Sequence, residues 1–318
     1  MFSRILVPLD GSERAARALP VAARLARASG GALVLTQVLS GLGEFLPYVV
    51  PGFEPSTLSA DLENATAYLQ SLTTLDEMKD IPAEVEVHTG LAPSMILEVA
   101  RARQAELIVL TSRGQTGLAR WVLGSVAQKV ARHAEMPVLL LQEEGALPLG
   151  PHPEPERPLR ALVALDGSPA AEAALGPAIQ VVVALAAPGP AAVHLLQVAH
   201  PAGELEPSRA YLKGQVERLR AAQPPELTLE ISWSVARDQD VAEAIARTAE
   251  TGESAEGAAA PGGCDLIALT TYGASGRQAW ALGGVAERVV GGSKLPLLVV
   301  RPAEEGAEGE RRETAGGA

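Results

Sequence analysis

Short apolar runs alternate along the chain with longer segments in which apolar residues recur every three or four positions. The run from Ile5 to Leu9 is almost entirely apolar, which is typical of a strand buried on both faces. The apolar side chains between Leu58 and Leu72 step by three or four, which predicts a long amphipathic helix. This alternation predicts an α/β fold with a parallel, doubly wound sheet and helices on both faces.

The same reading gives bounds for the other elements of the first half. Ser12 is a suitable N-cap for a helix that ends near Gly30-Gly31, and Pro20 is expected to bend that helix. The strand around Val85 and Val87 alternates, so we expect it half-exposed at a sheet edge. The expected strands are 5–9, 32–39, 84–88, 107–110 and 137–141, and the expected helices are 13–28, 58–72, 93–104 and 118–133.

The whole pattern occurs twice. LTSRGQTGLARWVLGSVA at 110–127 matches LTTYGASGRQAWALGGVA at 269–286, and the segment 5–12 matches 161–168. This indicates a tandem duplication of one domain. We therefore expect a first domain at 1–142, a Pro- and Glu-rich linker at 143–158, a second domain at 159–302 and a disordered tail at 303–318. Residues 251–263 have no match in the first half and are expected to form a flexible surface loop.

Composition narrows the class of protein. The net charge is −12, which argues against a nucleic-acid binder and against adhesion to an anionic membrane surface. The single cysteine, Cys264, excludes an intrachain disulfide and is expected to be a small residue at a strand start. The N-terminus shows no signal-peptide pattern and no apolar run reaches the roughly 18 residues of a membrane span. We expect a soluble, cytoplasmic protein.

Three repeated features follow the ends of predicted strands and should converge, because ligands of open parallel sheets bind beyond the carboxyl ends. Gly114 would let a phosphate approach the backbone, and the N–H groups and hydroxyl at Gly124-Ser125 suit an anion. The carboxylate of Asp10 suits ribose hydroxyls, and Val38 suits an adenine slot. Each feature alone has an ordinary explanation as a turn or a core residue, but their joint repetition indicates a nucleotide site.

On these motifs the sequence resembles a tandem universal stress protein, over about residues 3–142 and 159–302. The family motif is Gly-x2-Gly-x9-Gly-Ser/Thr, preceded by a strand-end Asp, on a five-stranded doubly wound sheet. The resemblance implies that the motif surrounds the phosphates of ATP, with the Asp at the ribose and a strand-2 residue at the adenine. It implies a first site lined by Pro8, Asp10, Val38, Leu110, Gly114, Gly124, Ser125 and Val126.

Two departures from the family motif bear on the site. Thr111 and Thr270 stand where the motif has its first Gly, and either narrow the site or replace a contact. Gly284 stands in place of Ser125 and either removes a needed hydroxyl donor or simply leaves room, with the backbone N–H groups sufficing. We therefore expect a competent first site, with Thr111 beside it, and a weaker or empty second one. The second site would comprise Asp166, Val198, Thr270, Gly273, Gly283 and Gly284.

These features predict an ATP-binding protein of the stress response, with Mg²⁺ held mainly by the phosphates and water. A nucleotide-free interaction module and a slow ATPase are the alternatives; no residue stands out as a general base, and no histidine pair has zinc spacing. The resemblance implies that the last strands, 138–141 and 297–300, pair the halves as an intrachain pseudo-dimer. We also expect that two chains can form a homodimer, through these strands or through the apolar segment 42–53. The alternatives for that segment are a lid over the first site or packing on its own domain. A protein partner is expected but not identified.

Overall fold

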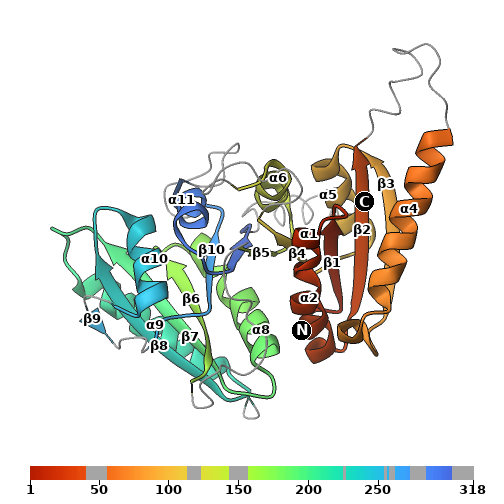
Figure 1. The fold of residues 1–318 in the computed structure, drawn as a ribbon. Helices are drawn as coiled ribbons and strands as arrows, with labels where there is room; N and C mark the ends of the chain where they lie inside the picture. The colour runs from red at the N-terminus through yellow and green to blue at the C-terminus, as the bar shows by residue number, and fades with distance from the viewer. Residues whose placement is uncertain are drawn as a thin grey trace, which may run out of the picture.

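The computed structural model describes residues 1–40, 56–112, 123–142, 157–224, 227–253, 256–257, 262–272 and 284–302. Within them, eleven strands form one sheet in the order β3-β2-β1-β4-β5-β11-β10-β6-β7-β8-β9 (Figure 1). All neighbouring strands are parallel except the pairs β5–β11 and β8–β9. The strands are β1 (Arg4–Leu9), β2 (Ala32–Ser40), β3 (Ala83–Gly90), β4 (Leu107–Thr111), β5 (Val138–Leu141), β6 (Leu159–Leu165), β7 (Ala191–Ala199), β8 (Leu229–Arg237), β9 (Glu256–Gly257), β10 (Leu266–Thr270) and β11 (Leu297–Val300).

Helices cover both faces of this sheet, as the sequence predicts. Alternation along each strand divides the core: in β1, Ile5 and Val7 pack with α2, whereas Leu6 packs with α5 and α6. The helices are α1 (Glu13–Ala16), α2 (Ala18–Ser29), α4 (Ser56–Thr73), the 3-10 helix η1 (Asp76–Met78), α5 (Ala92–Ala102), α6 (Ser125–His133), α7 (Pro169–Glu172), α8 (Leu175–Ala186), α9 (Glu206–Ala222), α10 (Val241–Thr251) and α11 (Gly284–Gly292). The fold is thus two tandem doubly wound, five-stranded parallel units, and the second carries β9 as an extra edge strand.

Three sequence-based expectations need correction. The first helix breaks at Arg17, not at Pro20, because Pro20 lies in the first turn of α2, where its missing N–H has no helical acceptor. The helix expected over 118–133 begins at Ser125, and residues 118–122 lie outside the described part of the chain. The expected loop at 251–263 contains β9, which pairs antiparallel with β8. The Gly30 stop is confirmed by its left-handed φ of 63°.

The two halves are joined at the centre of the sheet by an antiparallel strand pair. Leu140 of β5 lies opposite Leu297 of β11, and Val138 lies opposite Val299. This confirms the intrachain pseudo-dimer. It corrects the expected homodimer through the last strands, because β5 also pairs with β4, and β11 with β10, so neither strand has an open edge. The segment 42–53, the other expected dimer contact, lies outside the described residues.

Helices reinforce this junction on both faces. On one face α2 packs on α8, and Arg24 donates hydrogen bonds of 2.5 Å to the carbonyls of Leu185 and Ala187. These carbonyls lie at the C-terminal end of α8, where a cation also meets the negative end of the helix dipole. On the other face, Gln128 of α6 donates to Glu287 of α11 at 3.0 Å.

The expectation that no apolar run reaches the length of a membrane span was wrong: Pro169–Ala186 is long and apolar enough by length and composition alone, with a mean hydropathy of 1.5. Half of it is buried in the fold, and it comprises two helices, α7 and α8. Because α8 packs against β6, β7 and α2, its apolar composition is accounted for by the core.

His194 is a fully buried polar residue in the second half. Its Nδ1 lies 2.8 Å from Ser232 Oγ and its Nε2 lies 2.7 Å from Ser234 Oγ, so both ring nitrogens are hydrogen-bonded. Burial and, to a smaller extent, the nearby charge of Arg160 together lower the pKa of His194 from 6.5 to about 4. The imidazole is therefore neutral in the folded protein at neutral pH.

Arg24→Ala should lower the free energy of unfolding by about 1–3 kcal/mol, because two carbonyls at the end of α8 lose a charged donor. Urea denaturation measures this change. Arg101→Ala is the control, because Arg101 forms an exposed ion pair with Glu135, a kind of pair that contributes under about 1 kcal/mol. Equal losses in the two variants would contradict a special role for Arg24 at the junction.

Stability should fall with acid through His194. Its pKa in the folded state lies below its ordinary value, so the unfolded chain binds the proton more readily. The contribution is complete above about pH 6.5 and declines as the pH falls towards 4, by about 2 kcal/mol between pH 7.5 and 5. His194→Gln should remove that part of the pH dependence in urea titrations at the two pH values. An unchanged difference between these pH values would contradict the assignment.

Candidate functional site

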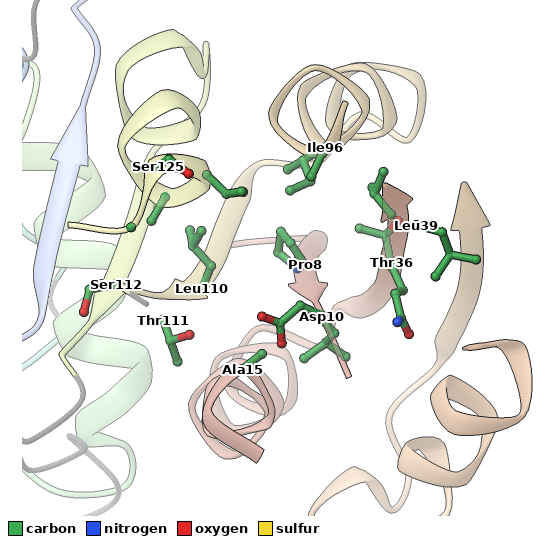
Figure 2. Close-up of a pocket in the computed structure, with 17 residues that line it drawn as sticks. Pro8, Asp10, Ala15, Thr36, Leu39, Ile96, Leu110, Thr111, Ser112 and Ser125 are labelled. Carbon is green, nitrogen blue, oxygen red and sulfur yellow. The ribbon is translucent and has the colours of Figure 1, made fainter. Parts of the chain in front are cut away.

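A pocket of about 450 Å³ lies in the first half, beyond the carboxyl ends of β1, β2 and β4 (Figure 2). This is where the order of strands reverses, since β1 has β2 on one side and β4 on the other. The helices α1, α5 and α6 complete the walls. The lining residues are Pro8, Leu9, Asp10, Ala15, Thr36, Gln37, Val38, Leu39, Ala92, Ile96, Leu110, Thr111, Ser112, Gly124, Ser125, Val126 and Ala127.

Residues expected at the first site lie together in this pocket. They come from separate parts of the chain and meet because three strands end at the same sheet edge. Gly114 lies outside the described residues. The expected residues that line the pocket are Pro8, Asp10, Val38, Leu110, Thr111, Gly124, Ser125 and Val126.

Asp10 is held by the turn that follows β1. The N–H and the hydroxyl of Ser12 both donate to Asp10 Oδ1, at 3.0 and 2.6 Å, and Gly11 permits the turn with a φ of 82°. Figure 2 shows the carboxylate on the side of the pocket that faces Thr111. Thr111 lines the pocket without filling it. The turn therefore presents an acceptor group at a fixed place in the wall.

The start of α6 forms the opposite wall. Gly124 is the N-cap, with extended backbone and no side-chain capping bond, and its own N–H donates to the Ser112 carbonyl at 2.8 Å. The N–H groups of the first turn that follows have no acceptor within the helix and suit an anion. The exposed Ser125 adds a hydroxyl at the same point. This wall can bind phosphate oxygens.

Between these two polar walls lies an apolar slot. Val38 of β2, Ile96 of α5 and Leu110 of β4 contribute to one hydrophobic cluster, and Pro8 closes the floor (Figure 2). Sequence reasoning found Val38 and Leu110 but missed Ile96 and Thr36. Both had a signal: Thr36 precedes Val38 by two residues on the same strand face, and Ile96 lies one turn into the helix after β3.

The second half keeps the turn but changes the surroundings. Asp166 accepts the N–H and hydroxyl of Ser168 at 3.0 and 2.6 Å, as Asp10 does with Ser12, yet Asp166 is exposed. Val198 and Thr270 lie at the ends of β7 and β10, and the Thr270 hydroxyl donates to the Tyr272 carbonyl at 2.8 Å. Gly284 is the first residue of α11. Gly273 and Gly283 lie outside the described residues.

An ion pair also ties α10 to α11. Asp240 caps α10 by accepting the N–H of Glu243 and pairs with Arg288, and these two contacts lower the pKa of the Asp240 carboxyl. The corresponding first-half positions are Leu91, which is 77% exposed, and Lys129, which cannot form this pair with a leucine. The two helices that border the site are thus linked in the second half in a way that the first half does not allow.

The sequence matches the universal stress protein family over residues 1–142 and again over residues 159–301. The chain belongs to the universal stress protein family. It is 34% identical over 143 residues to a universal stress protein of Thermus aquaticus, which covers 45% of this chain and all of that relative. It is 25% identical over 249 residues to a universal stress protein of Mycobacterium tuberculosis, which covers 75% of each protein.

A solved structure shows the same tandem architecture. The universal stress protein from Archaeoglobus fulgidus superposes with a TM-score of 0.64 at 20% identity, over 95% of this chain and 97% of that chain. At this identity the likeness shows the fold. It agrees with the two family segments in the sequence.

A metal site requires a cluster of ligand side chains, and a reactive thiol requires a lowered pKa. In the described part of the chain, no group of three His, Cys, Asp or Glu side chains is placed to hold a metal ion. Burial raises the pKa of the Cys264 thiol to about 12, so it stays protonated at neutral pH. Cys264 is buried next to β10, consistent with a small core residue at a strand start.

Proposed function

We propose that the first-half pocket binds ATP and that this universal stress protein acts in the stress response through nucleotide-dependent conformation or partner binding. The observation that supports this most is the meeting of an acceptor carboxylate, an apolar slot and a helix N-terminus around one pocket. Its volume of about 450 Å³ lies within the usual range for small-molecule sites. These three features match ribose, base and phosphates respectively.

The pocket residues would divide the ligand between them. Asp10 would accept hydrogen bonds from the ribose hydroxyls, and the slot at Val38 and Leu110 would take the adenine. Ser125 and the first turn of α6 would bind the phosphates. Mg²⁺ would be held by phosphate oxygens and water, since Asp10 is the single carboxylate among the described lining residues.

Binding is favoured over turnover. Asp10 is the one ionisable side chain among the described residues that line the pocket, and Ser12 already occupies its Oδ1. A slow ATPase would need a general base near the terminal phosphate, whereas Asp10 lies across the pocket from Ser125 (Figure 2). A nucleotide-free interaction module would leave the polar walls without a role. A cytoplasmic location is part of the same proposal, because a chain with one cysteine forms no intrachain disulfide and so suits a reducing compartment.

The second half is proposed to bind nucleotide weakly or not at all. Gly284 offers no hydroxyl where Ser125 does, and the pair of Asp240 with Arg288 restrains the two helices beside the site. The two halves of one chain would then differ in nucleotide occupancy.

Asp10→Ala should weaken ATP binding about 10- to 100-fold, because hydrogen bonds to a charged acceptor contribute about 1.5–3 kcal/mol. Calorimetric titration of nucleotide-stripped protein with magnesium-ATP measures this, and we expect about one site per chain in the wild type. Asp166→Ala is a matched control, because both aspartates accept the same two bonds from a serine two residues later. Equal losses in both variants, or two equivalent sites per chain, would contradict the assignment to the first half.

Ser125→Gly copies the second-half residue into the first half and should weaken magnesium-ATP binding by a similar factor, through the lost hydroxyl. Gly284→Ser, at the corresponding position, should leave the affinity of the first site unchanged. The same titration reports both variants. Undiminished affinity in Ser125→Gly would show that the backbone N–H groups of α6 suffice.

A further inference from the structure

Thr36 is a polar residue at the floor of the apolar slot. It lies in β2 between Pro8 of β1 and Glu86 of β3 in the strand register, and it is fully buried. It lines the pocket (Figure 2). Its side chain shares a strand face with Val38, which follows two residues later in β2. Within the described residues, its Oγ1 has no hydrogen-bond partner.

An unpaired buried hydroxyl is costly, since hydrogen bonds to water are lost and nothing replaces them. The fold does not require a hydroxyl here. The corresponding residue of the second half is Leu196, which pairs with Ala164 as Thr36 pairs with Pro8 and is equally buried. An aliphatic side chain therefore fits this place in the sheet, and the hydroxyl calls for another explanation.

Gln37, the next residue of β2, does not distinguish the first half from the second. Its Oε1 is also buried without a partner, but so is Oε1 of Gln197 at the corresponding place in the second half. A feature common to both halves is explained by the shared fold. Among the described residues that line the pocket, Thr36 carries the unpartnered group that differs between the two halves.

Thr36 lies where the buried edge of a purine base would lie if the base occupied the apolar slot. It precedes Val38 by two residues, which is roughly 7 Å further into the sheet at the rise of a β-strand. A purine stacked against Val38 with its ribose at Asp10 would direct an edge bearing ring nitrogens and an exocyclic group towards this floor. A hydroxyl can donate or accept as its proton rotates, so it can pair with either kind of group.

We propose that the Thr36 hydroxyl is a specificity-determining contact that hydrogen-bonds the inner edge of the bound purine base. This rests on the proposed nucleotide function. It adds a side chain that recognises the base itself to the groups that hold ribose and phosphates. Leu196 removes that recognition from the second half.

Thr36→Val tests the proposal, because it keeps the shape of the side chain and removes the hydroxyl. We expect magnesium-ATP affinity to fall about 10-fold by calorimetry, while the melting temperature of the nucleotide-free protein rises because an unpaired hydroxyl is gone. Thr36→Ser should keep the affinity within about threefold. Affinity unchanged in Thr36→Val, or lost equally in Thr36→Ser, would overturn the proposal.

Two controls separate base recognition from distortion of the pocket. Thr248→Val removes another buried Oγ1 without a described partner, in α10 of the second half, and should raise the melting temperature without changing ATP affinity. Ribose 5-triphosphate, which lacks the base, should bind the wild type and Thr36→Val equally. An equal loss for ATP and for ribose 5-triphosphate would overturn base recognition.

The two proposals fail in different ways. No binding of magnesium-ATP to the wild type would end the proposed function. Binding to the wild type with full affinity in Thr36→Val would end only the role of Thr36.

Discussion

The antiparallel pairing of β5 with β11 is the interaction on which the rest of the molecule depends. It turns two sheets into one and covers two apolar edges that would otherwise be open to association. Once these strands are paired, α2 meets α8 on one face and α6 meets α11 on the other. The contacts of Arg24 and Gln128 therefore follow from the strand pairing, and they fix how the halves sit against each other.

The pocket depends on the same parallel architecture at a smaller scale. Parallel strands that end at one edge bring Asp10, Val38 and Thr111 together although they are far apart in the sequence. The helix α6, which follows β4 in the chain, begins at Ser125 beside the same pocket. The chemistry of each wall is then set by single residues, and this is why the two halves share a fold while Thr36, Leu91 and Ser125 distinguish their sites.

Much of this could be predicted from the sequence, because the relevant signals are local or repeated. Apolar runs such as Ile5–Leu9 mark buried strands, and the matched motifs mark the duplication. The break at Arg17 escaped prediction because proline is tolerated in a first turn, so Pro20 gave a false signal. Strand β9 escaped it because two residues have no periodicity. The pair between Asp240 and Arg288 is a contact across 48 residues, which single-sequence patterns do not reveal.

The antiparallel direction of the β5–β11 pair determines which way the carboxyl ends of the strands face in each half. Because β5 and β11 run in opposite directions while the five main strands of each half are parallel, the carboxyl ends of these strands lie on opposite borders of the sheet in the two halves. The first-half pocket and the matching region of the second half therefore face opposite sides of the molecule. Because both halves belong to one chain, the pair always combines two different borders, which carry different residues at matching places, such as Ser125 and Gly284.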